Sequence, residues 1–496
     1  MRFFRAITFG VLVVAIGVLT GCDNFLKPEV HSQLAPENYL NTEQGLRSTL
    51  GSAYAGDFGG GVMWGNGTAK YRTLHMSDWQ TGIMWQTGGG ENRNASLMIN
   101  FNWDPSTNVG QAWNRPYNAI RDANIVLDNL EGADISEKQR ALFRAEARFI
   151  RALAYRDLYN WFGPVPLRTS TNEELEQPRA SEDSMRIFIE TEFSEVIPNL
   201  PDPGNQPQYG RATSAAAMAW LAKFYMNTQQ YQEAEETLSN FRSTYNFSLY
   251  PDYFELFQVE NERNDEFIWV DTMTPQGPGN PHMNQAFPPG FQSHPRTGLT
   301  MQDSWNNWAS QARLREDFYR SFDEDDERTE LIVREYVNAE DDTVDLLNDF
   351  EDNIRSFKWW PDPEGQGNLH GNDVPRIRFA DILLMHAEAI SEINDGPTQE
   401  AIDLVNRVRE RAGLTGEDQL ELANFDYESF RQHLLQERAW EFYHEGLRRE
   451  DLIRFEVFIE RAQERGVNAQ QYRRRMPIPQ FAMDANPELE QNTGYN

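Results

Sequence analysis

The feature that most limits the possible fold is an alanine-rich segment, SAAAMAWLAKFYMNTQQYQEAEETLSNF, at residues 214–241. Its small residues Ala219 and Ala222 are followed by Tyr225, Tyr231 and Ala234 at helical spacing. Small side chains allow two antiparallel helices to approach closely. The segment therefore predicts a pair of closely packed helices.

A related pattern recurs at ADILLMHAEAISEINDGPTQEAIDLVNRV, residues 380–408, with Ala387, Ala389 and Ala401 as the small residues. Both segments follow the register of a tetratricopeptide helix pair. Because the pairs are not evenly spaced, we expect helix hairpins interrupted by large insertions rather than a regular solenoid. Further helices are predicted at about residues 44–54, 113–127, 137–161 and 184–196.

Two long stretches lack helical periodicity and predict an irregular lobe with a few short strands. The first, residues 56–110, alternates glycine triplets with aromatic residues, and the second is the insertion 246–375. Within the second, residues 266–270 predict a short strand, 274–298 are too rich in proline and glycine for regular structure, and 323–352 are strongly acidic. A solvated surface explains these acids better than an ion site. Long aperiodic stretches usually carry function.

The amino terminus has the plan of a secretory signal. Arg2 and Arg5 precede a run from Ala6 to Gly21 that contains no charge, and this run ends in LTGC (19–22). That ending looks like a bacterial lipobox, in which Cys22 becomes the acylated first residue and residues 1–21 are removed. The alternative is a stray free cysteine beside a short membrane anchor. Since Cys22 is the only cysteine, the fold has no intrachain disulfide and must depend on packing.

Charge and motifs exclude several classes of function. The formal net charge of −32 argues against a nucleic-acid partner, because the chain would repel phosphate backbones. The sequence contains no zinc-protease, Cys-x-x-Cys, nucleophile-elbow or phosphate-loop motif, and its eight histidines never pair at helical spacing. We therefore expect no cofactor, no metal and no catalytic residue.

One helical stretch, QERAWEFYHEGLRREDLIR (436–454), carries three carboxylates at intervals of four residues: Glu437, Glu441 and Glu445. Like charges on one face would raise a pKa for acid–base chemistry. Four nearby arginines offer a simpler interpretation, a charged scaffold network in which they neutralise the acids. These arginines are Arg438, Arg448, Arg449 and Arg454.

A set of segments follows one order from Cys22 to the carboxyl terminus. It comprises CDNFL (22–26), the helix at 45–54, WNRPYNAIRDANIVLDNL (113–130), AEARFIRALAYRDLYNWFGPVPL (145–167), GRATSAAAMAWLAKFYM (210–226), NDEFIWV (264–270), RIRFADILLMHAEAI (376–390), NRVRERAGL (406–414), ERAWEFYHEGLRREDLIR (437–454), MPIP (476–479) and NPELEQNTGYN (486–496). Each segment alone is weak, but the ordered set resembles the SusD/RagB family of surface lipoproteins from Bacteroidetes-type bacteria.

The resemblance implies a mostly α fold, in which a tetratricopeptide-like helix-pair scaffold carries a large irregular lobe. It also implies a role, because such proteins sit as lids over a TonB-dependent (SusC-like) outer-membrane barrel. They capture a nutrient, typically a glycan and sometimes a peptide, and deliver it to the barrel. The family's ligand residues follow no motif, so none is transferred to this chain. Behind the cysteine, Asp23-Asn24 is a sparse acidic signal that favours display on the outer face of the outer membrane.

The segments divide the chain into a signal peptide (1–21), an amino-terminal helical region (22–245), an irregular insertion (246–375) and a carboxyl-terminal helical region (376–496). Two other classes of function stay open. A secreted glycan hydrolase would need a carboxylate pair that no spacing identifies. A helical-repeat adaptor would bind protein through its concave face.

The tryptophans supply the candidate ligand site. Five lie in periodic segments and are predicted to be core: Trp113, Trp161, Trp220, Trp269 and Trp440. The other eight lie in or beside aperiodic stretches: Trp64, Trp79, Trp85, Trp103, Trp305, Trp308, Trp359 and Trp360. Exposed aromatic rings suit the C–H face of a sugar.

We expect Trp79 and Trp85 from the first irregular stretch and Trp305 and Trp308 from the second to hold the ligand. Polar neighbours would fix hydroxyl groups: Arg72, Asp78, Gln86 and Asn92. The alternative for each tryptophan is that it only anchors its own loop.

Overall fold

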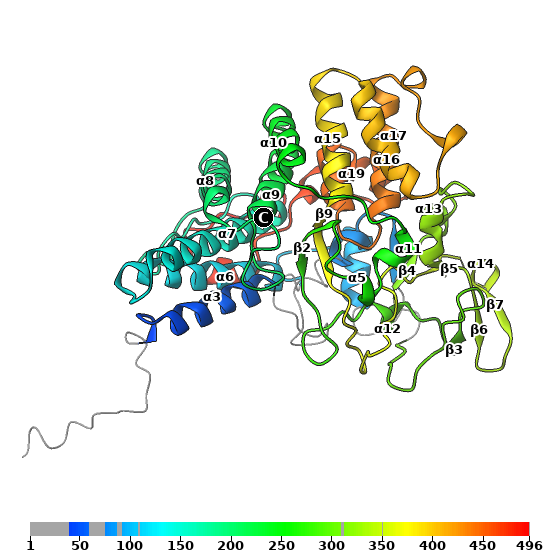
Figure 1. Ribbon diagram of the computed structural model, residues 1–496, viewed down its shortest axis with the longest axis horizontal. Coiled ribbons are helices and arrows are strands. Elements are labelled where there is room, and N and C mark those ends of the chain that lie inside the picture. The colour runs from blue at the N-terminus through cyan, green and yellow to red at the C-terminus, as the bar shows by residue number, and fades with distance from the viewer. Residues whose placement is uncertain are drawn as a thin grey trace, which may run out of the picture.

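The computed structural model describes residues 39–58, 75–86, 92–107, 110–308, 312–349 and 351–495. It has two parts that lie side by side (Figure 1). One is a helical half formed by α3 and α6 to α10. In the other, helices α15 to α19 stand above a lobe of short elements. The predicted mostly α fold with an irregular lobe is confirmed.

The helices of the first half follow from local sequence signals. Ser136 caps α7 with a reciprocal capping box to Gln139, and Gly163 ends it with a φ of 72°. The predicted helices 137–161 and 184–196 are confirmed to within two residues. The observed bounds are α3 (Glu43–Phe58), α6 (Gly110–Asn129), α7 (Glu137–Phe162), α8 (Glu182–Val196), α9 (Ser214–Asn227) and α10 (Tyr231–Thr244).

The alanine-rich segment forms the predicted helix pair α9 and α10. Ala219 and Ala222 are fully buried, as is Ala234 on α10. The second predicted pair is α15 and α16, and α10 packs against α15. The carboxyl-terminal helices are α15 (Phe379–Ile393), α16 (Gln399–Arg411), α17 (Tyr427–Phe442), α18 (Arg448–Arg454), α19 (Phe458–Glu464) and α20 (Gln480–Ala485).

Short elements build the lobe. Its strands are β1 (Met84–Gln86), β2 (Phe267–Asp271), β3 (Phe291–Ser293), β4 (Ala312–Leu314), β5 (Ile332–Val333), β6 (Glu335–Asn338), β7 (Thr343–Asp345), β8 (Arg355–Ser356) and β9 (Val374–Arg378). Its helices are α5 (Asn92–Ile99), α11 (Tyr253–Leu256), α12 (His282–Ala286), α13 (Glu316–Tyr319) and α14 (Leu346–Asp349). The described chain also has a helical turn at 75–79 and short 3₁₀ helices: η1 (Leu130–Gly132), η2 (Ile197–Asn199), η3 (Val259–Asn261), η4 (Glu327–Leu331), η5 (Gly416–Asp418), η6 (Leu422–Asn424) and η7 (Gln471–Arg474).

The strands pair antiparallel in four small sheets, with orders β1-β4, β2-β9, β3-β6-β7 and β5-β8. The strand predicted at 266–270 is confirmed as β2, displaced by one residue. The expectation that 274–298 has no regular structure is wrong, because α12 and β3 lie within it. Helix α5, in the first aperiodic stretch, has eight residues and is too short for its periodicity to stand out.

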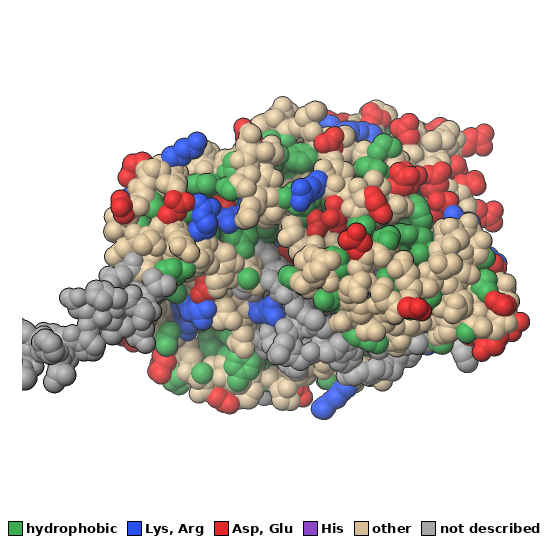
Figure 2. Space-filling model, turned by 60° about the horizontal axis from the view of Figure 1, so that its bottom comes forward, with side chains coloured by type: hydrophobic (Ala, Val, Ile, Leu, Met, Phe, Trp, Pro, Cys, Tyr) green, Lys and Arg blue, Asp and Glu red, His purple; other side chains and the backbone are tan. Residues whose placement is uncertain are grey.

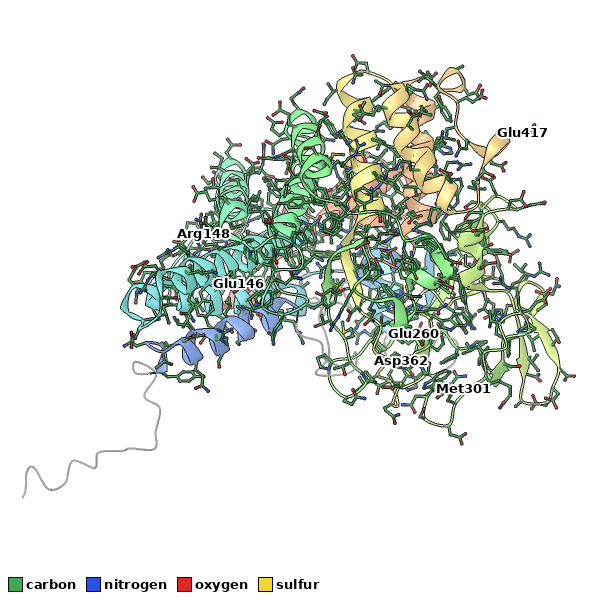
Figure 3. All side chains as sticks on the ribbon, in the orientation of Figure 1. Glu146, Arg148, Glu260, Met301, Asp362 and Glu417 are labelled. Atoms are coloured by element: carbon green, nitrogen blue, oxygen red, sulfur yellow. The ribbon has the colours of Figure 1, made fainter. Side chains whose placement is uncertain are left out.

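The lobe has its own hydrophobic core. Phe287, Phe291, Trp305 and Phe357 pack together in it, each at most 5% exposed. Side chains fill the lobe, where Asp362 and Met301 are labelled in Figure 3, as well as the helical half, where Glu146 is labelled. The irregular lobe is therefore a packed body and not a set of loose loops.

Most of the acidic run at 323–352 is solvated, as predicted: Asp323, Glu324 and Asp325 are all exposed. Asp326 is the exception, because it is buried against Arg328 with an ion-pair distance of 2.7 Å. Acidic side chains also gather at the right-hand end of the face shown in Figure 2, the side on which the lobe lies in Figure 1.

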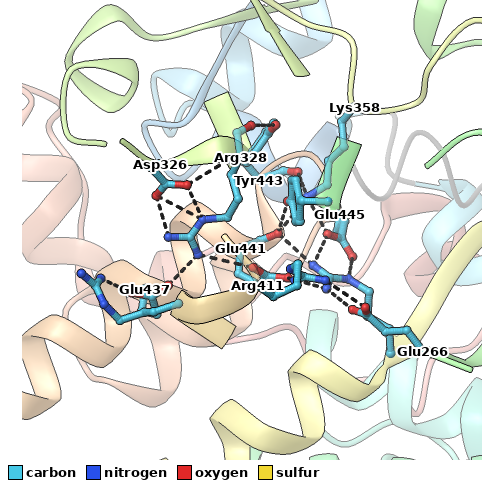
Figure 4. Close-up of polar contacts among 12 residues, drawn as sticks. Glu266, Asp326, Arg328, Lys358, Arg411, Glu437, Glu441, Tyr443 and Glu445 are labelled. Atoms are coloured by element: carbon cyan, nitrogen blue, oxygen red, sulfur yellow. Dashed lines mark hydrogen bonds and ion pairs between the residues drawn. The ribbon is translucent and has the colours of Figure 1, made fainter. Parts of the chain in front are cut away.

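The carboxylate stripe belongs to a buried ion-pair network that joins the lobe to the carboxyl-terminal helices (Figure 4). Glu437 and Glu441 lie on α17, and Glu445 lies in the turn that follows. Arg378 of β9 donates to Glu445 at 2.8 Å and also binds Glu441. Further cations come from distant segments: Arg328, Lys358, Arg409 and Arg411.

The charged-scaffold interpretation is confirmed, but the predicted partners are wrong. Arg438 pairs with Asp381 and Asp451, because a residue next to Glu437 points to another face of the helix. Burial alone would raise the pKa of Glu441. The charges of Arg411, Arg378 and Arg328 outweigh that effect and lower the pKa to about 2. The carboxylate is therefore ionised at neutral pH and unsuited to acid–base catalysis there.

The predicted core tryptophans Trp113, Trp161, Trp220, Trp269 and Trp440 are all buried. No helix in the described ranges is both long and apolar enough to cross a membrane. Cys22 and the signal segment lie outside the described residues. The division of the chain after residues 21, 245 and 375 stays a prediction.

Candidate functional site

The pairing of β1 with β4 brings the two irregular stretches together. Met84 lies opposite Leu314, Trp85 opposite Arg313, and Gln86 opposite Ala312. The ladder continues where the Arg315 amide donates to the Ile83 carbonyl at 2.9 Å. Residues far apart in the sequence thus form one local surface, as expected for a site built from two insertions.

Trp85 occupies the outer face of β1. Met84 and Gln86 are buried while Trp85 is half-buried, because alternate side chains of a strand point to opposite faces. The guanidinium carbon of Arg315 lies 4.3 Å from the centroid of the Trp85 ring. Arg315 is itself held by Asp352 at 2.8 Å. This cation–π contact fixes the orientation of the indole.

A groove of about 400 Å³ opens beside this ring, within the range of roughly 300–1,000 Å³ that is common for small-molecule sites. Trp79 and Trp85 form its aromatic wall. Asn100, Arg315, Asp317 and Arg465 supply polar groups, and the remaining lining residues are Gly82, Ile99 and Val467.

Arg465 reaches the groove from α19 and its following turn. It donates to the carbonyls of Gln80 and Thr81 at 2.9 and 3.2 Å. Burial, followed by the charge of Arg315, lowers its pKa to about 10, so the guanidinium remains charged at neutral pH. Gly82 has a φ of 83°, and a Cβ at this position would lie 2.9 Å from the Arg465 Cδ. Glycine is therefore required where the two segments meet.

The structure differs from the expectation that all four candidate tryptophans are exposed. Trp79 lines the groove but is only 3% exposed, lies in the main core and packs against His75 at 5.6 Å. Trp305 is 5% exposed and stacks on Phe287 with an angle of 16° between the ring planes. Both positions fit the loop-anchoring alternative, because glycine-rich loops without helical periodicity still need an apolar core.

Trp308 is half-buried, and its backbone amide donates to the Asn284 carbonyl at 2.7 Å. It does not line the groove beside Trp85. Trp85 and Trp308 thus remain the candidates with accessible rings. Their role in ligand binding stays a prediction.

The polar candidates Asp78, Gln86 and Asn92 also differ in burial. Asp78 and Gln86 are buried, and burial raises the pKa of Asp78 well above its usual value. Neither offers its side chain to the groove. Asn92 is exposed at the start of α5, and Arg72 lies outside the described residues.

Sequence reasoning missed Asn100, Arg315, Asp317 and Arg465. Arg315 follows the short run Ala312–Leu314, whose three residues give too little signal to identify a strand, and Arg465 comes from a different region altogether. The groove combines aromatic surface with charged hydrogen-bond donors, which suits non-covalent recognition of a polar ligand. No three histidine, cysteine or acidic side chains among the described residues are grouped to hold a metal ion.

Comparison with known proteins gives matches along the whole chain. A family model described as "SusD family" matches residues 208–495, and one described as "Starch-binding associating with outer membrane" matches residues 24–226. The SusD-like protein P25 of Formosa agariphila is 26% identical over 536 residues, covering 98% of this chain and 98% of its own. The starch-binding protein SusD of Bacteroides thetaiotaomicron is 24% identical over 474 residues, covering 83% of this chain and 82% of its own.

Two solved structures illustrate the shared fold. A laminarin-binding SusD-like protein has a TM-score of 0.78 at 24% identity and covers 92% of this chain and 100% of its own. Surface glycan-binding protein A from Bacteroides thetaiotaomicron, in complex with laminarihexaose, has a TM-score of 0.74 at 22% identity, with 91% and 99% covered. At these identities the likeness concerns the architecture.

Proposed function

Because this chain belongs to the SusD family, we propose that it is an outer-membrane lipoprotein that captures a glycan and delivers it to a TonB-dependent transporter. The observation that carries the proposal is the groove beside Trp85, where an oriented indole ring stands next to charged hydrogen-bond donors. Aromatic faces suit the apolar side of a sugar ring, and the polar groups suit its hydroxyls.

The class of ligand is supported by the relatives. Their names refer to starch, laminarin and laminarihexaose, all of which are glucose polymers. We therefore propose an oligosaccharide as the ligand of this chain, held by Trp85 and Trp308 with help from Asn92, Asn100 and Arg465. A peptide ligand is the alternative within the family.

We propose that Cys22 carries the lipid anchor and that the protein faces the exterior. Two or more acyl chains anchor a protein stably, whereas one does not. A lid placed over a barrel must reach the barrel's outer mouth, which is consistent with the sparse acidic signal behind Cys22. The partner would be a SusC-like barrel that is bound through a broad protein face.

We propose no catalytic role. Three carboxylates have the spacing most suggestive of acid–base chemistry: Glu437, Glu441 and Glu445. All three are paired with arginines in the buried ion-pair network. A hydrolase would instead reveal itself by turnover of a glycan panel.

The test is calorimetry on the purified protein with laminarihexaose, maltohexaose and a mixture of neutral peptides. We expect a hexasaccharide to bind, and Trp85→Ala to weaken binding by about 2 kcal/mol, roughly thirty-fold. The matched control is Trp360→Ala, because Trp360 is also partly buried but packs against Phe254 at 4.6 Å, away from the groove. Binding of the peptides without either glycan would favour the peptide alternative. Equal loss in both variants would contradict a specific role for Trp85.

A further inference from the structure

A second cavity, of about 590 Å³, lies in the helical half and shares no lining residue with the groove beside Trp85. The ends of α7 and α9 form one side of it. The segment around η7 and the last residues of the chain form the other, and Figure 1 shows the carboxyl terminus beside α9. Asn492 fixes this arrangement by donating to the carbonyls of Phe162 and Met476 at 2.9 and 2.7 Å.

The charge of this lining is unusual for the molecule. Among the described residues, the charged side chains that line the cavity are Arg156, Arg474 and Arg475, with no aspartate or glutamate. The whole chain has 77 acidic residues against 45 lysines and arginines, and the groove beside Trp85 includes Asp317. The charged residues of this lining are therefore all cationic in a chain that is strongly acidic as a whole.

The base of the cavity is already neutralised. Arg156 pairs with Asp157 at 2.9 Å and also binds Glu450, which lies behind the lining. The amides of Asn160 and Asn227 donate to the same Glu450 carboxylate at 2.9 and 2.8 Å. Burial would raise the pKa of Glu450, but Arg156 and Lys223 attract its charge and lower the pKa to about 2. The charge of Arg156 is therefore already compensated by two carboxylates, and we do not expect Arg156 to bind an anionic ligand.

Arg474 and Arg475 form the rim of the cavity, and their charges are less fully compensated than that of Arg156 at its base. Arg474 is half-buried, and its side chain donates to the Ile453 carbonyl at 3.3 Å. In the described ranges no carboxylate lies within ion-pair distance of Arg474. Arg475 does pair with Glu182 at 2.9 Å, but both side chains are more than two-fifths exposed, so this pair is weak and easily exchanged. The rim thus presents one uncompensated guanidinium and a second one nearby.

Aromatic side chains complete the cavity. Tyr159 packs against Phe224 at 5.9 Å and Tyr472 against Tyr495 at 4.9 Å, so both tyrosine rings are held in place. A volume of about 590 Å³ far exceeds that needed by a free ion and is within the usual range of pockets for small organic ligands.

We propose that this cavity binds the oxyanion group, a sulfate ester or a carboxylate, of an acidic saccharide, with Arg474 as its main contact. A guanidinium forms paired hydrogen bonds with such oxyanions, and the tyrosine rings receive the sugar. The oxyanion part follows from the lining alone, whereas the saccharide part rests on the proposed function. Neutral sugar rings would then be recognised at Trp85, and an acidic sugar separately at Arg474.

The experiment is a ligand-observed NMR titration of the full-length lipoprotein in detergent with glucose 6-sulfate, glucuronate, glucose and sodium sulfate. We expect one of the two acidic sugars to bind at least tenfold more tightly than glucose, and more weakly as salt is added. Arg474→Gln should reduce that affinity at least tenfold. Arg474→Lys, which keeps the charge but loses the paired donors, should fall between the two.

The matched control is Arg334→Gln, which removes the same charge from a side chain that is 48% exposed and lies in the lobe. It should bind like the wild type, and thermal melts of all variants should coincide. Equal binding by wild type and Arg474→Gln would overturn the inference, as would an equal loss in Arg334→Gln. If sodium sulfate binds as tightly as the acidic sugars, the saccharide part is overturned.

The two proposals fail separately. Laminarihexaose or maltohexaose binding that Arg474→Gln leaves intact, without any binding of the acidic sugars, would remove the inference and keep the proposed function. Loss of acidic-sugar binding in Trp85→Ala would contradict the inference, because the cavity and the groove have no lining residue in common.

Discussion

Replacing Glu441 by glutamine tests whether the buried network stabilises the fold through charge. Glutamine has nearly the same shape as a protonated glutamate, so the variant imitates the wild type at low pH. Glu441 accepts hydrogen bonds from Arg378 at 2.5 Å and from Arg328 at 3.3 Å, and it also binds Arg411. The substitution leaves these three buried cations with less negative charge to compensate them.

The size of the expected change in the free energy of unfolding follows from the pKa of Glu441. The pKa of Glu441 falls from the ordinary value of 4.5 to about 2 in the folded protein. At about 1.4 kcal/mol for each unit, the ionised carboxylate contributes on the order of 3 kcal/mol to the free energy of unfolding. The loss expected from breaking a buried ion pair, roughly 3–5 kcal/mol, is similar.

The sign of the pH dependence is fixed by the direction of the shift. Because the folded pKa is lower than the unfolded one, the stabilisation is complete above pH 4.5 and is lost as the pH falls toward 2. We expect the wild type to exceed Glu441→Gln by about 3 kcal/mol at pH 7, with the two converging below pH 4.5.

The assay is urea denaturation, followed by tryptophan fluorescence, in a series of buffers between pH 3 and pH 7. The control is Glu428→Gln on the same helix, since Glu428 is exposed and accepts a hydrogen bond from Gln432 at 2.8 Å. It should change the free energy of unfolding by less than about 0.5 kcal/mol. A difference between wild type and Glu441→Gln that stays constant across the pH series would refute the charge argument.

Four further predictions concern other parts of the molecule. Cys22→Ser should release the protein from membranes while leaving it folded, and outer-membrane fractionation of the variant in cells without the partner barrel would contradict the lipid anchor. A gentle detergent extraction should recover the protein together with a co-expressed outer-membrane barrel, and recovery of the lipoprotein alone would count against that partner. Trp305→Ala should lower stability by about 3–5 kcal/mol in thermal melts because its ring is buried, whereas Trp85→Ala should lower glycan binding and leave melting nearly unchanged. Burial and the neighbouring Glu262 raise the pKa of Asp373 to about 8, so stability is lost as the pH rises from about 4 through 8; Asp373→Asn should melt higher than the wild type at pH 9 and no higher at pH 4, and equal melting at pH 9 would show that the carboxyl group is not strained by its charge.

The sequence was sufficient for the helices because they are long and periodic. Helix α7 runs for 26 residues between a serine cap and a glycine stop, so its bounds were predictable to one residue. The strands of the lobe have two to five residues and no alternation that stands out from their surroundings. Their pairing is decided by tertiary contacts, such as β2 with β9, which a single sequence does not display.

The site was predictable only in part, for two physical reasons. An aperiodic stretch does not tell which tryptophans are buried, and Trp103 and Trp359 prove to be as buried as any in the helices. Polar residues that reach a site from distant segments, as Arg465 does, leave no local pattern. Trp85 was identified because it is a tryptophan in an aperiodic stretch, but the cations around it were not.

The pairing of β1 with β4 also determines when, during folding, the groove beside Trp85 can form. Trp85 comes early in the chain, but its strand has no partner until the chain as far as Leu314 is present, and the groove lacks Arg465 until later still. Contacts between such distant residues form slowly, because the long intervening chain must first be ordered. An amino-terminal fragment that ends before Ala312 would lack β4 and Arg465, and therefore the groove. Ligand binding at this groove would therefore report that the chain has folded as far as Arg465.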